Sequence, residues 1–317
     1  MSDSAPQDPD LTVLIPLYNE VESLQELYAQ LAAALEPTGL SFELLFIDDG
    51  SRDGSFEAIV RLREQDERVK AVQFRRNYGK SAALAVGFEE ARGRKYVVTI
   101  DADLQDDPKE IPGLINQIEE GCDLVSGWKQ SRQDPITKTL PSKLFNRVTA
   151  MVSGLRLHDF NCGLKAYRRE VIETIPVYGE LHRYLPVLAH WSGFHVTERP
   201  VAHHPRKYGE TKFGVGRFTH GFFDLLTVYF VSKYTRRPLH WFGTLGLLAF
   251  GTGFGFAVYL TWLWAQGIGI GTRPLLLFSV LLMLLGIQLM SMGLIGEMIA
   301  HVSRRTEEYA VRMRLGN

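Results

Sequence analysis

The C-terminal third of this 317-residue chain contains two long stretches without a charged side chain. No Asp, Glu, Lys or Arg lies between Arg237 and Arg273, and none lies between Arg273 and Glu297. Each stretch exceeds the roughly 20 apolar residues that an α-helix needs to cross a bilayer, and a helix buried in a soluble domain rarely reaches that length without a charge. The pattern therefore predicts two transmembrane helices, at about 239–265 and 275–299.

The basic residues around these stretches predict their orientation. Several precede the first stretch and several follow the second, whereas Arg273 alone lies in the short connection. Because short cytoplasmic segments are enriched in Lys and Arg, this distribution places both termini and the N-terminal domain in the cytoplasm. We therefore expect an integral protein of the cell (plasma) membrane. The flanking basic residues are Lys233, Arg236 and Arg237 before the first stretch, and Arg304, Arg305, Arg312 and Arg314 after the second.

Composition divides the chain into further parts. Residues 1–10 are polar and acidic, lack the apolar core of a signal peptide, and are expected to be disordered. Residues 11–213 mix charged, apolar and turn residues as a soluble domain does. Apolar residues recur at three- and four-residue steps within 214–237, which favours an amphipathic helix in the bilayer interface, although a helix packed on the soluble domain has the same pattern. The membrane helices occupy 238–300, and 301–317 form a basic cytosolic tail.

The soluble domain alternates between strand and helix patterns. Apolar runs predict strands at 11–15, 42–47, 69–74 and 95–100, and helical spacing of apolar residues follows each of the first three. Such alternation predicts an α/β fold with a mostly parallel sheet flanked by helices, whose ligands bind beyond the carboxyl ends of the strands.

A polar cluster directly follows each of these strands. In the last of them, Asp101 and Asp103 stand one residue apart, and a strand would point both carboxylates the same way. Such a pair can hold a hard cation, Mg²⁺ or Mn²⁺, together with the phosphates of a ligand. Alone, the pair also fits a simple turn before Pro108, but clusters at one sheet edge favour a shared nucleotide site. The clusters are 16–20, 48–51, 76–80 and 101–103.

Other classes of function lack their expected residues. No Gly-x-Gly-x-x-Gly follows the first strand and no Gly-x-x-x-x-Gly-Lys-Ser/Thr loop occurs, which favours a nucleotide sugar over a dinucleotide or a P-loop ligand. The net charge of −1 says nothing about nucleic acid, and no basic cluster with interleaved aromatic residues argues for it, so we expect no nucleic-acid partner. Cys122 and Cys162 have no metal-ligand spacing, and we expect both to be reduced core residues.

Six short motifs run through nearly the whole chain and are followed by the two apolar stretches. The motifs are Pro16-Leu-Tyr-Asn-Glu20, Ile47-Asp-Asp-Gly-Ser51, Arg76-Asn-Tyr-Gly79, Asp101-Ala-Asp-Leu-Gln105, Asp159-Phe-Asn-Cys-Gly163 and Arg206-Lys-Tyr-Gly-Glu-Thr-Lys212. Together they resemble family 2 glycosyltransferases of the GT-A fold, specifically the polyprenyl-phosphate (dolichol-phosphate) glycosyltransferases.

The resemblance implies roles for the donor side of the site. Asp48 would contact the nucleotide base. Asp101, Asp103 and Gln105 would hold the metal and the diphosphate, and Arg206 would close on the diphosphate. The full donor-binding set implied is Pro16, Tyr18, Asn19, Glu20, Asp48, Asp49, Gly79, Lys80, Asp101, Ala102, Asp103, Arg206 and Lys212.

The resemblance also implies an acceptor side. Lys129, Lys138 and Ser142 would hold the acceptor phosphate, with Lys at two positions where the family has Arg. A phosphomonoester is largely anionic near pH 7, since its second pKa is about 6, so this nucleophile needs no general base. The expected reaction is the metal-dependent, inverting transfer of a hexose from a donor of the UDP-glucose or GDP-mannose type to a polyprenyl phosphate at the cytoplasmic membrane face.

Several alternatives remain open from the sequence. Asp159 either takes part in catalysis with Asp101, Asp103 and Arg206 or caps the turn before Gly163. The runner-up functions are a family 2 enzyme that elongates a membrane-linked glycan and a sensor that binds a nucleotide sugar without turnover. Glycines allow close helix packing, which leaves a homo-oligomer open. These glycines are Gly243, Gly246, Gly251 and Gly255.

Overall fold

The computed structural model divides the chain into two compact units. The first comprises Met1–Leu226 and Glu307–Asn317, and the second comprises Thr227–Thr306. The residues that the structure describes are 8–130, 146–147, 149–175, 181–205, 207–208, 238–271, 273–302 and 311–315.

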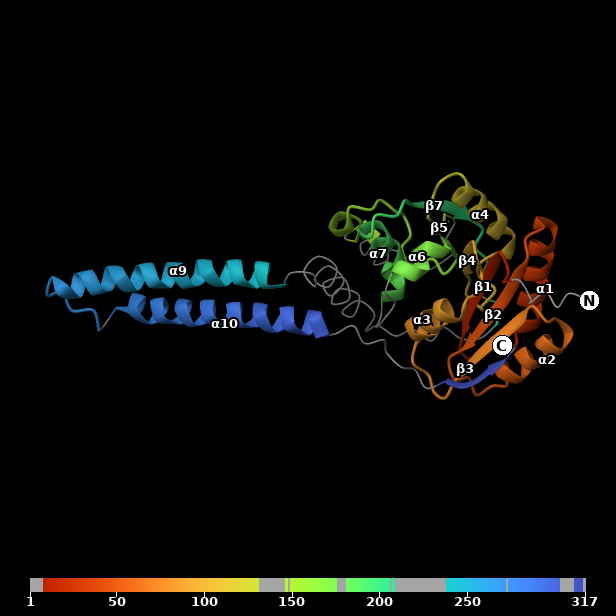
Figure 1. Cartoon of the computed structure of the whole chain (residues 1–317), viewed down its shortest axis with the longest axis horizontal. Helices are drawn as coiled ribbons and strands as arrows, with labels where there is room; N and C mark the ends of the chain where they lie inside the picture. The colour runs from red at the N-terminus through yellow and green to blue at the C-terminus, as the bar shows by residue number, and fades with distance from the viewer. Residues whose placement is uncertain are drawn as a thin grey trace, which may run out of the picture. The chain divides into compact units, whose positions relative to one another are not determined.

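A single mixed β-sheet organises the first unit (Figure 1). Its strand order in the described residues is β7-β5-β6-β4-β1-β2-β3-β8. The central strands β4, β1, β2 and β3 run parallel to one another, whereas β6 and β8 are antiparallel to their neighbours. The strands are β1 Leu11–Leu17, β2 Phe42–Asp48, β3 Val69–Phe74, β4 Tyr96–Thr99, β5 Leu124–Lys129, β6 Lys165–Arg168, β7 Val196–Val201 and β8 Val311–Leu315.

Helices cover both faces of this sheet, which explains why its central strands are continuous apolar runs. Val13 of β1 belongs to the core shared with α1, α2 and α4, whereas its neighbour Leu14 lies against Gly87 of α3 on the other face. The helices of this unit are α1 Leu24–Leu35, α2 Ser55–Gln65, α3 Lys80–Glu90, α4 Ile111–Glu119, α6 Arg169–Thr174 and α7 Leu185–Trp191. The sheet flanked by helices that the sequence predicts is therefore present.

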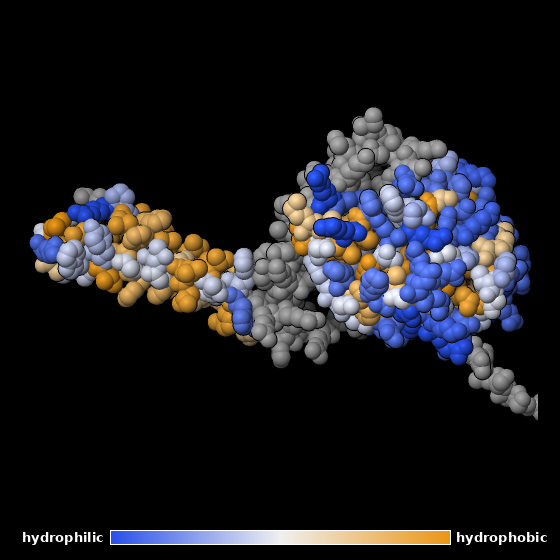
Figure 2. All heavy atoms as spheres, turned by 90° about the horizontal axis from the view of Figure 1, so that it is seen from above, coloured by the Kyte–Doolittle hydropathy of each residue, from blue (hydrophilic) through white to orange (hydrophobic). Residues whose placement is uncertain are grey.

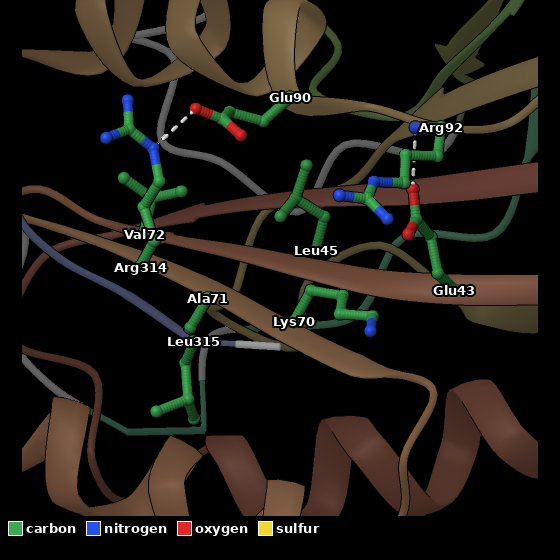
Figure 3. A pocket seen from close by; sticks show the side chains of 9 residues that line it. All are labelled: Glu43, Leu45, Lys70, Ala71, Val72, Glu90, Arg92, Arg314 and Leu315. Atoms are coloured by element: carbon green, nitrogen blue, oxygen red, sulfur yellow. Dashed lines mark hydrogen bonds and ion pairs between the residues drawn. The ribbon is translucent and has the colours of Figure 1, made fainter. Parts of the chain in front are cut away.

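Strand β8 lies in the segment 301–317, for which the sequence predicts only a basic tail. It pairs antiparallel with β3, with Ala71 opposite Leu315. Arg314 Nε lies 2.7 Å from Glu90 Oε1 at the end of α3, and Figure 3 shows these two side chains facing each other. The strand thus covers the backbone edge that β3 would otherwise expose.

The second unit contains two long apolar helices, α9 (Pro238–Ala265) and α10 (Pro274–Val302). The segments Leu239–Ala265 and Pro274–Met298 are long and apolar enough to cross a membrane. Only 17% and 11% of their most apolar windows are buried, so neither resembles the core helix of a soluble domain. Figure 2 shows hydrophobic side chains over most of this helix pair. The two candidate spans that the sequence predicts are therefore present.

Small residues allow α9 and α10 to approach closely. A Cβ added to Gly286 would lie 2.6 Å from the Gly246 carbonyl oxygen and 2.7 Å from the Phe250 nitrogen. A Cβ added to Gly253 would lie 2.6 Å from the Ser279 carbonyl oxygen. Backbone approach of this kind is typical of helix pairs in membranes, where van der Waals contact drives association.

Glu297, near the end of α10, contacts the start of α9. Its Oε2 accepts a hydrogen bond of 3.2 Å from the Leu239 backbone nitrogen, in the first turn of α9. The first N–H groups of a helix have no partner within the helix, and a carboxylate there also interacts favourably with the helix dipole. Glu297 therefore stabilises the start of α9.

We expect Gly286→Leu to separate the two helices, because the new side chain would overlap the α9 backbone. Gly251→Leu is the matched control, since nothing lies within 4 Å of a Cβ at Gly251. The measurement is the yield of a disulfide between cysteines placed at Phe242 and Gly293, which face each other across the pair. Gly286→Leu should lower this yield severalfold, and equal yields in both variants would contradict the packing described.

Candidate active site

The carboxyl ends of the central strands bring the predicted polar clusters together. Leu17, Asp48 and Gln73 lie side by side at the ends of β1, β2 and β3. The first three clusters therefore begin next to one another at this edge of the sheet. The fourth cluster follows β4, which pairs with β1 in parallel, so it begins at the same edge. This is the edge at which parallel α/β sheets bind their ligands.

Hydrogen bonds join the first two loops of this edge. The Asn19 nitrogen donates to Ser51 Oγ at 2.8 Å, and the Arg52 nitrogen donates to Asn19 Oδ1 at 2.8 Å. The Glu20 nitrogen donates to Ser55 Oγ at 3.0 Å. Asn19 has a φ of 53°, in the left-handed region that Asn tolerates better than most residues. The two loops therefore form one connected wall of the site.

Asp49 holds the third loop in place. Its Oδ1 accepts a hydrogen bond from the Tyr78 nitrogen at 2.7 Å, and its Oδ2 accepts one from the Gly79 nitrogen at 2.9 Å. Burial raises the pKa of Asp49, and these two hydrogen bonds oppose that rise. Asp49 thereby fixes the loop that leads into α3 and its first residue, Lys80.

Asp48 is fully buried beneath the same loops. Its Oδ1 accepts from the Ser51 nitrogen at 2.9 Å, and its Oδ2 accepts from Gln73 Nε2 at 3.1 Å. Both carboxylate oxygens therefore have partners within the protein. The contact between Asp48 and a nucleotide base stays a prediction.

The predicted metal ligands lie on a turn rather than on a strand. β4 ends at Thr99, so the alternation of a strand does not orient Asp101 and Asp103. The turn is closed by a 3.2 Å hydrogen bond from the Gln105 nitrogen to Asp103 Oδ1, and Leu104 has a φ of 59°. Asp101, Asp103 and Gln105 therefore stand on one turn and not on the pleat of a strand.

Asp101 is held between two neighbours. Lys80 Nζ lies 2.5 Å from its Oδ1, so the side chain of Lys80, the first residue of α3, places a positive charge beside the turn. A Cβ added to Gly163 would overlap the Asp101 carboxylate, and Thr99 Oγ1 donates to the Gly163 carbonyl oxygen at 2.8 Å. The absence of a side chain at Gly163 therefore leaves room for the Asp101 carboxylate.

The donor atoms of this turn suit a hard cation. Asp101, Asp103 and Gln105 offer only oxygen ligands, which Mg²⁺ and Mn²⁺ accept, and such ions commonly complete their shell with phosphate oxygens and water. Within the described part of the chain, no group of three or more His, Cys, Asp and Glu side chains is arranged to hold a metal by itself. The residues present thus fit an ion shared with a phosphate ligand.

A buried ion pair involves Asp106, the residue that follows Gln105. Lys129 Nζ at the end of β5 lies 2.8 Å from Asp106 Oδ1, and His203 Nδ1 lies 3.8 Å from the same oxygen. Burial raises the pKa of Asp106, but Lys129 and His203 outweigh this effect and lower the pKa to about 2. Sequence reasoning missed Asp106 and His203 as site residues, although Asp106 directly follows the motif that ends at Gln105.

Asp159 and Lys165 form a second buried group near Asp101. Asp159 is 1% exposed, and its Oδ1 accepts from the Asn161 nitrogen at 3.0 Å, which closes the turn before Gly163. Lys165 Nζ donates to the Cys162 carbonyl oxygen, and burial lowers the pKa of Lys165. The structure shows the capping role considered for Asp159, whereas its catalytic role stays a prediction.

Some predicted site residues lie outside the described residues. The other predicted donor residues, Pro16, Tyr18 and Ala102, lie at the same sheet edge. Four predicted site residues, Lys138, Ser142, Arg206 and Lys212, lie outside the described residues. The whole of the predicted interfacial segment 214–237 lies outside them as well.

The family model for glycosyl transferase family 2 matches residues 12–176, which span β1 through α6. The chain belongs to glycosyltransferase family 2. The resemblance noted from the motifs is therefore confirmed.

Two relatives match almost the whole length of this glycosyltransferase. A dodecaprenyl-phosphate galacturonate synthase of Rhizobium johnstonii is 35% identical over 323 residues, which cover 96% of this chain and 93% of that protein. An undecaprenyl-phosphate 4-deoxy-4-formamido-L-arabinose transferase of Pseudomonas aeruginosa is 38% identical over 300 residues, which cover 92% of this chain and 85% of that protein.

Solved structures share the fold of this glycosyltransferase. A mannosyltransferase from Pyrobaculum calidifontis in complex with GDP-Man and Mn²⁺ has a TM-score of 0.52 at 19% identity, covering 96% of this chain and 79% of that chain. A glucosyl-3-phosphoglycerate synthase from Mycobacterium tuberculosis has a TM-score of 0.53 at 18% identity, covering 70% and 78%. These likenesses confirm the predicted GT-A architecture.

We expect Gly163→Ala to lower sugar transfer by about 100-fold, because the new methyl group would displace the Asp101 carboxylate and small misplacements in an active site are costly. Transfer rate and the thermal unfolding midpoint should be measured together. A large loss of transfer with a nearly unchanged midpoint is the expected result. Full activity in this variant would contradict the importance of the Asp101 position.

The two cysteines should differ in reactivity. Burial raises the pKa of the Cys162 thiol to about 12, and Cys162 is 1% exposed, whereas Cys122 is partly exposed. Because the thiolate is the reactive form, iodoacetamide at about pH 8 should modify Cys122 well before Cys162 in the folded protein. Mass spectrometry of digested samples would show the order, and equal labelling would contradict the burial of Cys162.

Proposed function

We propose that this glycosyltransferase moves a sugar from a nucleotide-sugar donor to a polyprenyl phosphate, with inversion at the anomeric carbon. The observation that carries the proposal is the extent of the match to relatives named for dodecaprenyl and undecaprenyl phosphates. The matches cover 96% and 92% of the chain, so they extend past the family 2 domain into the apolar helix pair. A lipid acceptor gives that helix pair a purpose that a soluble acceptor does not.

The donor would bind at the carboxyl ends of β1 to β4. Asp101, Asp103 and Gln105 would hold a Mg²⁺ or Mn²⁺ ion against the diphosphate, and Lys80 lies beside Asp101 to add positive charge. When bound, the ion supplies charge that stabilises the departing nucleoside diphosphate. Arg206 would close on the same diphosphate.

The acceptor would supply its own nucleophile. Its phosphate is largely ionised near neutral pH, so the protein must hold and orient it rather than remove a proton. The family resemblance assigns this task to Lys138, Ser142 and Lys129, of which Lys129 is already paired with Asp106. Direct displacement by the phosphate would invert the anomeric centre of the sugar.

The membrane arrangement follows from the apolar helices and the basic residues that flank them. We propose that α9 and α10 span the membrane as a hairpin, with the catalytic unit and both termini in the cytoplasm. The lipid phosphate would then lie at the cytoplasmic surface of the membrane, on the same side as the site. Protease digestion of sealed membrane vesicles of known orientation would test this arrangement.

The reaction can be tested with the full-length protein in vesicles that contain undecaprenyl phosphate. The donor panel should include labelled UDP-glucose, GDP-mannose, a UDP-uronic acid and a UDP-4-formamido-arabinose, each with Mg²⁺ or Mn²⁺. We expect one donor to give lipid-extractable label. Asp103→Asn should reduce this label at least about 100-fold, since a lost ligand weakens the metal-diphosphate site.

Asp66→Asn is the matched control for the loss of one carboxylate, because Asp66 pairs with Arg68 at the end of α2, away from the four loops. It should leave transfer unchanged. Labelled glycan without labelled lipid phosphate sugar would favour the glycan-elongating enzyme. Donor binding without turnover would favour the sensor.

A further inference from the structure

Asp106 is a charged group in an unusual place. It follows the proposed metal ligand Gln105, and its side chain is fully buried. Burying a carboxylate is costly unless it is paired and hydrogen-bonded. The charge of Asp106 is balanced by Lys129 Nζ at 2.8 Å, and His203 Nδ1 lies 3.8 Å away. The protein therefore maintains a buried ion pair at the residue next to a proposed metal ligand.

This pair joins three segments of the chain. Asp106 belongs to the turn after β4, and Lys129 is the last residue of β5. His203 follows β7 and forms an isolated antiparallel bridge with Asp106, and the His204 nitrogen donates to the Gln105 carbonyl oxygen at 2.8 Å. The turn is thus fastened by backbone contacts to the end of β7 and by a side chain to the end of β5.

The position of Lys129 limits what else it can do. Its side chain is only 14% exposed, and its ammonium nitrogen lies 2.8 Å from the Asp106 carboxylate. A positive charge that is already paired attracts a second anion less strongly than an unpaired one. These contacts fit a residue that supports the turn better than a residue that captures the acceptor phosphate.

We propose that Lys129 acts on the reaction through Asp106: the buried pair positions the turn that carries Asp101, Asp103 and Gln105, and Lys129 does not bind the acceptor phosphate. The proposal rests on the metal site in the proposed function. In metal sites, partners of the ligands are known to change metal affinity by about 10- to 100-fold when they are removed. Lys129 and Asp106 would be positioning residues of this kind.

The test compares Lys129→Met, Asp106→Asn, the double variant and Lys129→Arg in the full-length protein. One readout is the affinity for Mn²⁺, alone and with UDP or GDP, measured from the free Mn²⁺ signal in electron paramagnetic resonance. The other readout is the separate determination of kcat and of KM for undecaprenyl phosphate. Lys109→Met is the matched control, because Lys109 is an exposed lysine close to the same turn.

We expect Lys129→Met and Asp106→Asn each to weaken Mn²⁺ binding about tenfold and to lower kcat, with KM for undecaprenyl phosphate changed less than about twofold. The double variant should be no worse than the more impaired single variant, because both act through one contact. Lys129→Arg should keep near-normal Mn²⁺ affinity, since Arg can also pair with a carboxylate. Lys109→Met should match the wild type.

Two results would overturn the proposal. One is a KM for undecaprenyl phosphate at least about tenfold higher in Lys129→Met with unchanged Mn²⁺ affinity, which is the signature of an acceptor ligand. The other is unchanged Mn²⁺ affinity and kcat in Asp106→Asn, which would leave the pair a purely structural role. If a single variant does not fold, the double variant and Lys129→Arg decide by the same criteria.

The Mn²⁺ readout also separates this proposal from the proposed function. If the wild type transfers no sugar to undecaprenyl phosphate, the proposed function fails, while Mn²⁺ binding by the variants still tests the role of the pair. If the wild type transfers sugar but the variants bind Mn²⁺ normally, the proposed function stands and the positioning role fails.

Discussion

Backbone hydrogen bonds between β4, β1, β2 and β3 run in parallel register, so these four strands deliver their following loops to the same edge of the sheet. Helices on both faces bury the strands and leave this edge as the place where polar side chains gather. Asp48, Asp49 and the turn at Asp101 all depend on that arrangement. A change of register in one strand would separate the loops that form the site.

Buried carboxylates hold these loops together. Asp49 accepts hydrogen bonds from two backbone nitrogens of the loop before α3, and Asp48 ties its own loop to β3. Asp106 connects the turn after β4 to the end of β5 through its ion pair with Lys129. An unpaired buried carboxylate is strongly unfavourable, so each of these contacts fixes one arrangement of the loops rather than several. These carboxylates order the loops of the site through contacts within the protein.

The sequence predicts the parts of the fold that depend on local patterns. Strand β3 has the predicted bounds, and α1 buries Leu24, Leu27, Leu31 and Leu35, which have the helical spacing expected after the first strand. The motif ending at Gln105 also identified the candidate metal turn. These features were accessible because apolar periodicity and turn residues act over a few positions.

Other features depend on contacts between distant residues. The pairing of Asp106 with Lys129 and the fit of Gly163 beneath Asp101 require the folded chain, so no spacing in the sequence indicates them. Because β4 ends at Thr99, the two carboxylates stand on a turn and not on the pleat of a strand. Strand β8 is short and rich in arginine, and it forms because the edge of β3 is available to pair with it.

The pairing of β8 with β3 has a consequence for how the protein is made. β3 is synthesised early, whereas β8 follows both apolar helices in the chain. Until β8 emerges from the ribosome, the outer edge of β3 has no strand beside it, and such an edge can pair with other chains. The sheet therefore becomes complete only after both apolar helices have been synthesised.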